Sequence, residues 1–151
     1  MIKIARLCQI LLVLLCLNSN NVFSQSPSVW EPIYLTASGH NRVQGIEGLF
    51  RAEICSNGER VVFIKFINHN SQDIKLEWYH GVFTQELKWV NKEGESDKKT
   101  VMINGNKEAQ GACSSTAPFQ ELIIKLSDFI DDPNNFKRYS AINLEITVIK
   151  N

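Results

Sequence analysis

Apolar and polar residues alternate along several stretches of this chain with a period of two. Between residues 73 and 78 every second side chain is apolar, namely Ile74, Leu76 and Trp78. Residues 141–150 repeat the alternation, and we expect them to form a last strand with these side chains inward: Ile142, Leu144, Ile146 and Val148. Because successive side chains of a strand point to opposite faces, the pattern predicts strands with one face in a core and the other in water.

An Asn57-Gly58 pair separates two further apolar runs. Asn-Gly provides the positive φ angles that tight hairpin turns need, so residues 49–55 and 60–68 are predicted to pair antiparallel. The second run is apolar on both faces apart from Lys65. A strand of that kind is usually central in its sheet.

Turn signals recur at intervals of roughly 8 to 12 residues, and no strong amphipathic helix interrupts them. About six or seven strands are expected in all. The pattern predicts an all-β fold, an antiparallel immunoglobulin-like β-sandwich over residues 40–151, with Trp78 in its core. Residues 25–39 are expected to form a lead-in segment, with an edge strand at residues 33–36 and Trp30 packing on the domain as an anchor.

The first residues have the pattern of a secretory signal peptide. Lys3 and Arg6 precede an apolar run over residues 7–17, which polar residues follow. The run is too short for a stable transmembrane anchor, which takes about 20 residues. We therefore expect residues 1–24 to be a signal peptide, with cleavage after Ser24 and a secreted or periplasmic product. A lipoprotein acylated at Cys16 is the less favoured alternative, because that processing requires a small residue where Leu15 stands.

Loss of residues 1–24 removes two basic residues and no acidic one, so the remaining chain has two more acidic than basic residues. This balance gives no electrostatic reason to expect nucleic acid or an anionic membrane as a partner.

Cys55 and Cys113 are the two cysteines outside the predicted signal peptide. In an oxidising compartment such a pair usually forms a disulfide. A redox or metal pair would require close CxxC spacing or additional histidine ligands, and the sequence has neither around these positions. We therefore predict a structural disulfide.

Three segments carry a resemblance to known proteins: CSNGERVVFIKFINHNSQDIKLEW, TVMINGNKEAQGAC and the terminal NLEITVI. They are similar to small secreted bacterial immunoglobulin-like β-sandwich proteins of unassigned function, over about residues 46–150. The resemblance implies the fold and the compartment, and it carries no catalytic residue.

The stretch SDFIDDPNN over residues 127–135 gathers three carboxylates, those of Asp128, Asp131 and Asp132. Oxygen ligands at this density can hold calcium. The spacing and the glycine of an EF-hand loop are missing, however, and Asp and Asn also favour turns. A turn is the favoured interpretation, so neither a metal nor a cofactor is expected.

The histidines His40, His69 and His80 are expected in solvated positions, because their spacing matches no zinc motif. Ser114, Ser115 and Thr116 follow Cys113, but no GxSxG motif surrounds them and no base can be placed beside them from sequence. We therefore do not expect an enzyme.

The aromatic stretch EWYHGVFTQELKW contains the strongest candidate binding residues, Tyr79 and Phe83, which share the outward phase of Lys75 and Glu77. Exposed aromatic side chains on a sheet can stack on a sugar ring or anchor a peptide. The alternative is that the Trp30 lead-in or a loop covers them. Residues 91–99, expected to be a hairpin tip, and residues 106–118 are further candidate surfaces.

These features predict a secreted, non-enzymatic binding or structural module of the cell envelope, with a protein, peptide or glycan partner. The alternative is a small secreted hydrolase or enzyme inhibitor that acts through the loop around Cys113.

Overall fold

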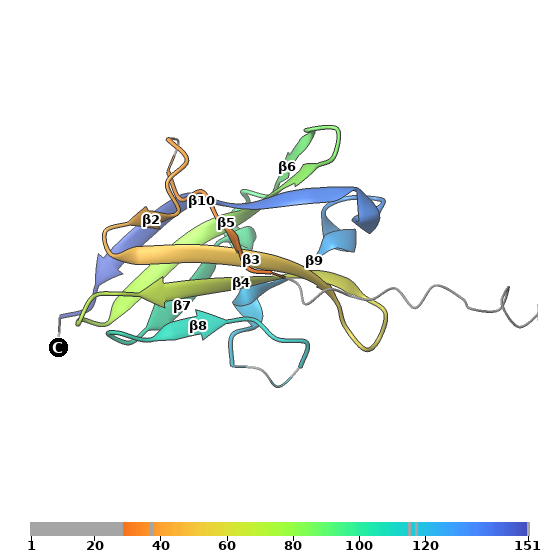
Figure 1. Cartoon of the computed structure of the whole chain (residues 1–151). Helices are drawn as coiled ribbons and strands as arrows, with labels where there is room; N and C mark the ends of the chain where they lie inside the picture. Colours follow the sequence, from red (N-terminus) through yellow and green to blue (C-terminus); the bar gives the residue numbers. More distant parts are fainter. Residues whose placement is uncertain (1–28, 37, 115, 117, 151) are drawn as a thin grey trace, which may run out of the picture.

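A computed structural model describes residues 29–36, 38–114, 116 and 118–150 (Figure 1). The predicted signal peptide, its cleavage after Ser24 and the lipoprotein alternative at Cys16 lie outside the described residues. Within them, no helix has the length and apolar character needed to cross a membrane.

The chain forms two antiparallel β-sheets, which confirms the all-β, antiparallel prediction. In the first sheet the order is β1-β3-β4-β8, and β2 and β9 pair with β3 and β4 respectively. Its strands are β1 (Glu31–Pro32), β2 (Arg42–Val43), β3 (Ile46–Ile54), β4 (Arg60–Asn68), β8 (Glu108–Gln110) and β9 (Ile123–Lys125).

In the second sheet β5 lies between β10 on one edge and both β6 and β7 on the other. Its strands are β5 (Ile74–Thr84), β6 (Trp89–Asn91), β7 (Lys99–Ile103) and β10 (Phe136–Val148). Short 3-10 turns complete the described structure: η1 (Glu95–Asp97), η2 (Gln120–Leu122), η3 (Leu126–Asp128) and η4 (Pro133–Asn135).

The predicted hairpin between β3 and β4 is confirmed, with Ile54 opposite Arg60. Gly58 supplies the one positive φ angle of the turn, +81°, and Asn57 is not among the residues with positive φ. The turn is therefore wider than the two-residue type, and the Cys55 N–H donates to the Glu59 carbonyl at 2.9 Å. β4 is central as predicted, because β3 occupies one edge and β8 and β9 share the other.

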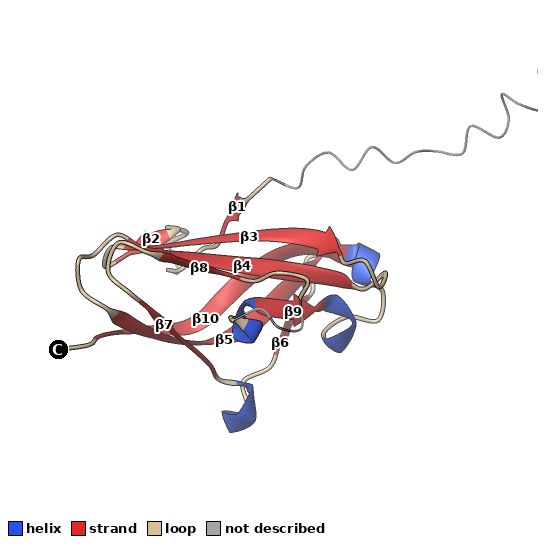
Figure 2. Ribbon diagram, turned by 90° about the horizontal axis from the view of Figure 1, so that it is seen from below, coloured by secondary structure: helices blue, strands red, loops and turns tan. Residues whose placement is uncertain are grey.

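The two sheets lie face to face (Figure 2). Their inner faces enclose one hydrophobic core. Trp78 is fully buried there, as predicted, and its ring lies 5.2 Å from that of Phe66 on the opposite sheet. Phe50 and Tyr139 make a second contact across the core, with ring centroids 6.3 Å apart. These aromatic pairs fill the space between sheets that the aliphatic side chains leave.

The lead-in segment crosses from the first sheet to the second. Its strand lies at Glu31–Pro32, two residues before the predicted one, and Tyr34 then forms an isolated parallel bridge with Ser140 of β10. The ring of Trp30 lies 4.7 Å from the Arg51 guanidinium and 4.8 Å from the Lys65 ammonium. Such cation–π contacts hold the segment on the outer face of the first sheet, so the prediction that Trp30 is an anchor is confirmed.

The predicted inward phase of the last strand is wrong for Ile142. β10 begins at Phe136, earlier than expected, and carries a β-bulge between Ile142 and Glu145, where Asn143 has a φ of +51°. The extra residue of a bulge shifts the side-chain alternation by one position. Ile142 therefore pairs with Tyr79 and shares its outward face, whereas Ile146 pairs with buried Leu76.

The prediction of a hairpin tip at residues 91–99 is also wrong. β6 pairs with Gly81–Phe83 and β7 pairs with Ile74–Trp78, so both strands lie along the same edge of β5. The segment between them leaves this edge and returns to it.

The predicted disulfide between Cys55 and Cys113 is confirmed, with 5.5 Å between the Cα atoms. It ties the β3–β4 turn to the segment that follows β8.

Candidate functional site

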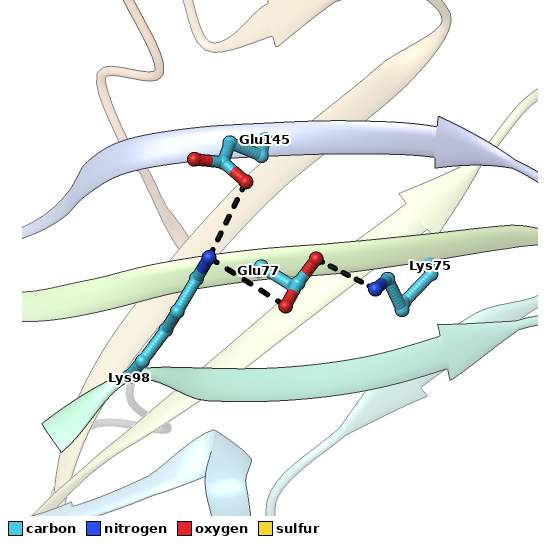
Figure 3. Close-up of polar contacts among 4 residues, drawn as sticks. All are labelled: Lys75, Glu77, Lys98 and Glu145. Atoms are coloured by element: carbon cyan, nitrogen blue, oxygen red, sulfur yellow. Dashed lines mark hydrogen bonds and ion pairs between the residues drawn. The ribbon is translucent and has the colours of Figure 1, made fainter. Parts of the chain in front are cut away.

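The outward face of the second sheet has a charged half and an aromatic half. In the charged half the Lys75 ammonium lies 2.7 Å from Glu77, and Lys98 bridges Glu77 at 3.6 Å and Glu145 at 3.3 Å (Figure 3). The hydrogen bond from Lys75 lowers the pKa of Glu77, and the hydrogen bond to Glu145 raises the pKa of Lys98. These side chains are partly exposed, so the network keeps this half hydrophilic and contributes little to stability.

Three residues form the aromatic half: Tyr79 and Phe83 of β5, and Trp89 of β6. We call these three residues the aromatic surface. Trp89 is paired with Phe83, and their ring centroids are 4.4 Å apart. A Cβ atom at Gly81 would lie 2.2 Å from Cη2 of Trp89, so the missing side chain allows the indole to lie across β5. The bulge turns Ile142 outward. Its Cδ1 would lie 2.7 Å from a Cβ atom at Gly81, so Ile142 also borders the space above this glycine.

The two residues predicted from sequence are both half-buried on this face. Trp89 is the residue packed on Phe83, whereas Trp30, the predicted cover, lies on the other sheet beside Arg51 and Lys65. Sequence reasoning did not place Trp89 in the site, because β6 was not predicted as a strand. A signal was present, since the apolar pairs Val82-Phe83 and Trp89-Val90 flank the polar stretch TQELK.

Trp89 also borders a cavity of about 600 Å³, which we call the Trp89 cavity. Phe129 and Ile130 supply further apolar wall. Five lining residues carry carboxylate or amide groups: Glu86, Asn91, Asp131, Asp132 and Asn135. The amide of Asn135 donates to Glu86 at 2.6 Å, and this hydrogen bond lowers the pKa of the Glu86 carboxyl. The cavity thus combines aromatic rings with planar polar groups that can donate and accept hydrogen bonds.

The three calcium candidates do not come together. Asp131 and Asp132 line the Trp89 cavity, whereas Asp128 lines a different one. Asp132 accepts hydrogen bonds from the backbone and side-chain nitrogens of Asn134, at 2.9 and 3.1 Å, as a turn-forming aspartate does. Throughout the part of the chain that the structure describes, no three acidic, histidine or cysteine residues are grouped as metal ligands would be.

The prediction that His80 is solvated is wrong. It lies within β5 on the same face as Trp78, and only 3% of its surface is exposed. Its Nδ1 lies 2.9 Å from the Tyr139 hydroxyl, and the Trp78 indole N–H reaches both groups. Burial and, secondarily, the charge of Lys99 lower the pKa of His80 to about 3, and burial raises the pKa of Tyr139. His40 and His69 are exposed, as expected.

The loop around Cys113 presents no described nucleophile–base pair. The Ser114 hydroxyl lies 2.8 Å from that of Thr116, and its carbonyl accepts from Gln120. Ser115 lies outside the described residues. The hydroxyls that the structure places here therefore bond to each other and to no histidine.

Comparisons with protein-family models, with curated proteins and with solved structures find no match for this chain. The resemblance to small secreted bacterial proteins therefore stays a prediction.

Proposed function

We propose that this protein is an extracytoplasmic, non-enzymatic binding module that recognises an uncharged saccharide with the aromatic surface and the adjoining Trp89 cavity. The observation that carries the proposal is the position of Trp89. Its indole packs on Phe83, and the same residue borders a cavity of carboxylates and amides.

A sugar ring has an apolar face of C–H groups and a rim of hydroxyls. The face can lie against an aromatic ring, which offers a large contact area at a low cost in conformational entropy. The rim hydroxyls can hydrogen-bond to carboxylate and amide groups such as those of Asn91, Asp131 and Asn135. Trp89 is 37% exposed, so the indole is accessible for stacking.

Charge narrows the class of saccharide. The lining of the Trp89 cavity holds three carboxylates, those of Glu86, Asp131 and Asp132, against one ammonium, that of Lys88. A carboxylated or sulfated glycan would be repelled there, as would nucleic acid. Peptide and protein partners, the other classes that the sequence allows, have no specific feature of this surface in their favour.

The proposal also includes an oxidising compartment for the protein and an immunoglobulin-like arrangement of its two sheets. A leader over residues 1–24 would direct the chain to an oxidising compartment, with which the Cys55–Cys113 disulfide is compatible. An immunoglobulin-like arrangement of the two sheets is supported by the central Trp78 and by a lead-in that contacts both sheets.

Titration of the ¹⁵N-labelled protein with fully N-acetylated chitotetraose, called chitotetraose below, and with cellotetraose, both uncharged, tests the function. We expect one of them to shift the indole N–H signal of Trp89 saturably. Trp89→Ala should weaken binding by about tenfold or more, because hot-spot aromatic residues dominate such contacts. Met102→Ala is the matched control, since Met102 is 61% exposed in the charged half of the same face.

Mass spectrometry of the titrated samples separates binding from catalysis. The proposal expects both tetrasaccharides to remain intact. Cleavage of either probe would favour the hydrolase alternative, and binding that Trp89→Ala does not weaken would refute the choice of surface.

A further inference from the structure

A second cavity, of about 500 Å³, lies between the two sheets, and His80 lines it. We call it the His80 cavity. On one side it is bounded by β5 and the start of β7, and on the other by β9 and the 3-10 turns that flank β9. Its polar groups differ from those of the Trp89 cavity, so we consider it as the site of a different ligand.

The hydrogen bonds of His80 determine where its proton lies. The Trp78 indole can only donate, and it donates to Nδ1 of His80 at 3.3 Å and to the Tyr139 oxygen at 3.0 Å. Nδ1 is therefore an acceptor, and the Tyr139 hydroxyl also donates to it, at 2.9 Å. Because the imidazole is neutral, its proton is on Nε2.

The Nε2–H group faces the His80 cavity. Trp78 and Tyr139 contact the opposite edge of the imidazole, and neither residue lines the cavity. Among the described residues no acceptor bonds to Nε2, although His80 is only 3% exposed. Nε of Arg51 is the only buried side-chain polar atom without a partner among the described residues, so Nε2–H of His80 is open to the cavity and can donate to a ligand that carries an acceptor.

Lys99 adds a positive charge at the same end of the cavity. It begins β7 opposite Trp78, and its charge reaches the imidazole of His80 strongly enough to contribute to the low pKa. Lys99 is half-buried and takes part in none of the ion pairs found among the described residues. A carboxylate oxygen is the group that would accept from both Nε2–H and the ammonium.

The remaining charges do not oppose this arrangement. Lys125 is already paired with Glu59 at 2.9 Å, and the carboxylates of Glu121 and Asp128 are on exposed residues. Asp97 accepts the Gly94 N–H at 3.2 Å. The lining holds three lysines and three carboxylates in all, and Lys99 is the charged group that acts on His80.

The wall beside these polar groups is apolar. Phe129 packs edge-on against His80, with ring centroids 6.3 Å apart, and Ile124 also lines the cavity. The Lys92 ammonium lies 4.9 Å from the centre of the Phe129 ring and makes a cation–π contact with it.

We propose that the His80 cavity binds a small carboxylate with an apolar body, with its carboxylate between Nε2–H of His80 and the Lys99 ammonium. The apolar body lies against Phe129 and Ile124. Phe129 lines both cavities, but Tyr79, Phe83 and Trp89 do not line the His80 cavity, so the polar groups of the two sites are separate.

Phenylacetate is the probe, and phenylacetamide is its uncharged counterpart. In the ¹⁵N-labelled protein, long-range ¹H–¹⁵N correlations report both imidazole nitrogens of His80 and should show the Nε2–H form in the free state. Phenylacetate should shift Nε2 saturably, with a dissociation constant in the low millimolar range or below. Phenylacetamide should bind at least about tenfold more weakly.

Lys99→Met removes the ammonium and keeps the chain length, and it should weaken phenylacetate binding by about tenfold or more. The matched control is Lys107→Met, an exposed lysine in the β7–β8 turn. Trp89→Ala should leave phenylacetate binding unchanged, which separates this site from the saccharide site. Equal binding of the amide, an unchanged affinity in Lys99→Met, or the absence of any shift at His80 would each overturn the proposal.

Discussion

The indole of Trp89 packs against the ring of Phe83 across the β5–β6 pair, with 4.4 Å between the ring centroids. Gly81 makes this contact possible, because a Cβ atom there would occupy the space that the end of the indole fills. A residue without a side chain thus positions the most exposed ring of the aromatic surface. The bulge at Asn143 completes the surroundings by turning Ile142 outward.

Gly81→Ala should displace the indole of Trp89 and weaken saccharide binding. The added methyl group would lie 2.2 Å from Cη2, and the indole can move only away from β5. We expect a loss of about 1 kcal/mol in the free energy of unfolding, the low end for overpacking, because this ring is partly at the surface.

A double-mutant cycle measured by urea denaturation checks this contact. In the Trp89→Ala background Gly81→Ala should cost less, although not zero, since the Ile142 methyl still lies 2.7 Å away. An equal cost in both backgrounds would mean that Gly81 does not position the indole.

His80 should make the protein less stable as the pH falls. In the unfolded chain this histidine takes up a proton near pH 6.5, whereas in the fold it does so only near pH 3. The unfolded state therefore binds more protons throughout that window, and stability is lost as the pH falls through it. Between pH 6.5 and pH 5 the loss should be on the order of 1 to 2 kcal/mol.

The measurement is urea denaturation at several pH values, for the unchanged protein and for His80→Gln. Whatever His80→Gln costs at neutral pH, its stability should fall less steeply over this window, because the carboxamide does not titrate. Parallel pH profiles for the two proteins would contradict the assignment of a neutral, buried imidazole.

Removal of the disulfide by Cys55→Ser with Cys113→Ser should destabilise the fold by about 4 kcal/mol, because the bond closes a long loop in the unfolded chain. The two cysteines are 58 positions apart. Comparison of urea midpoints with and without reductant measures the effect. Reductant should leave the double variant unchanged, and a midpoint shift there would show that the loss has another cause.

Trp30→Ala should release the lead-in segment from the first sheet. It removes the contacts with Arg51 and Lys65, which together contribute about 1 to 2 kcal/mol. Hydrogen exchange at the Ile33 amide, which donates to the Gly48 carbonyl at 2.9 Å, should become faster. Val29→Ala is the control, since Val29 is 77% exposed, and an equal effect of both variants would argue against the anchor.

The sequence predicted the parts of the fold in which alternation and burial agree. In β4 apolar side chains on both faces predicted a central strand. In β5 apolar side chains on one face alone predicted which face lies in the core. His80 could have been placed correctly, because it has the same phase as Trp78. It was missed because a glycine directly after it favours the end of a strand.

The parts of the fold that were not predicted depend on interactions that the local sequence pattern does not indicate. β6 follows a turn in which Leu87 has a φ of +64°, and leucine is not a turn residue, so the apolar pairs on either side of the turn were a weak signal for the pairing of Trp89 with Phe83. The bulge at Asn143 likewise has no signature in an alternating stretch. Both features bear on the aromatic surface, and for that reason the candidate site was predicted less well than the fold.

The most direct test of the saccharide proposal is the indole N–H signal of Trp89 during titration with chitotetraose and cellotetraose. The account predicts a saturable shift with one of the two, retained in Met102→Ala. In Trp89→Ala, which lacks this signal, the accompanying shifts of neighbouring backbone amides should be lost. A signal that neither tetrasaccharide moves would contradict it.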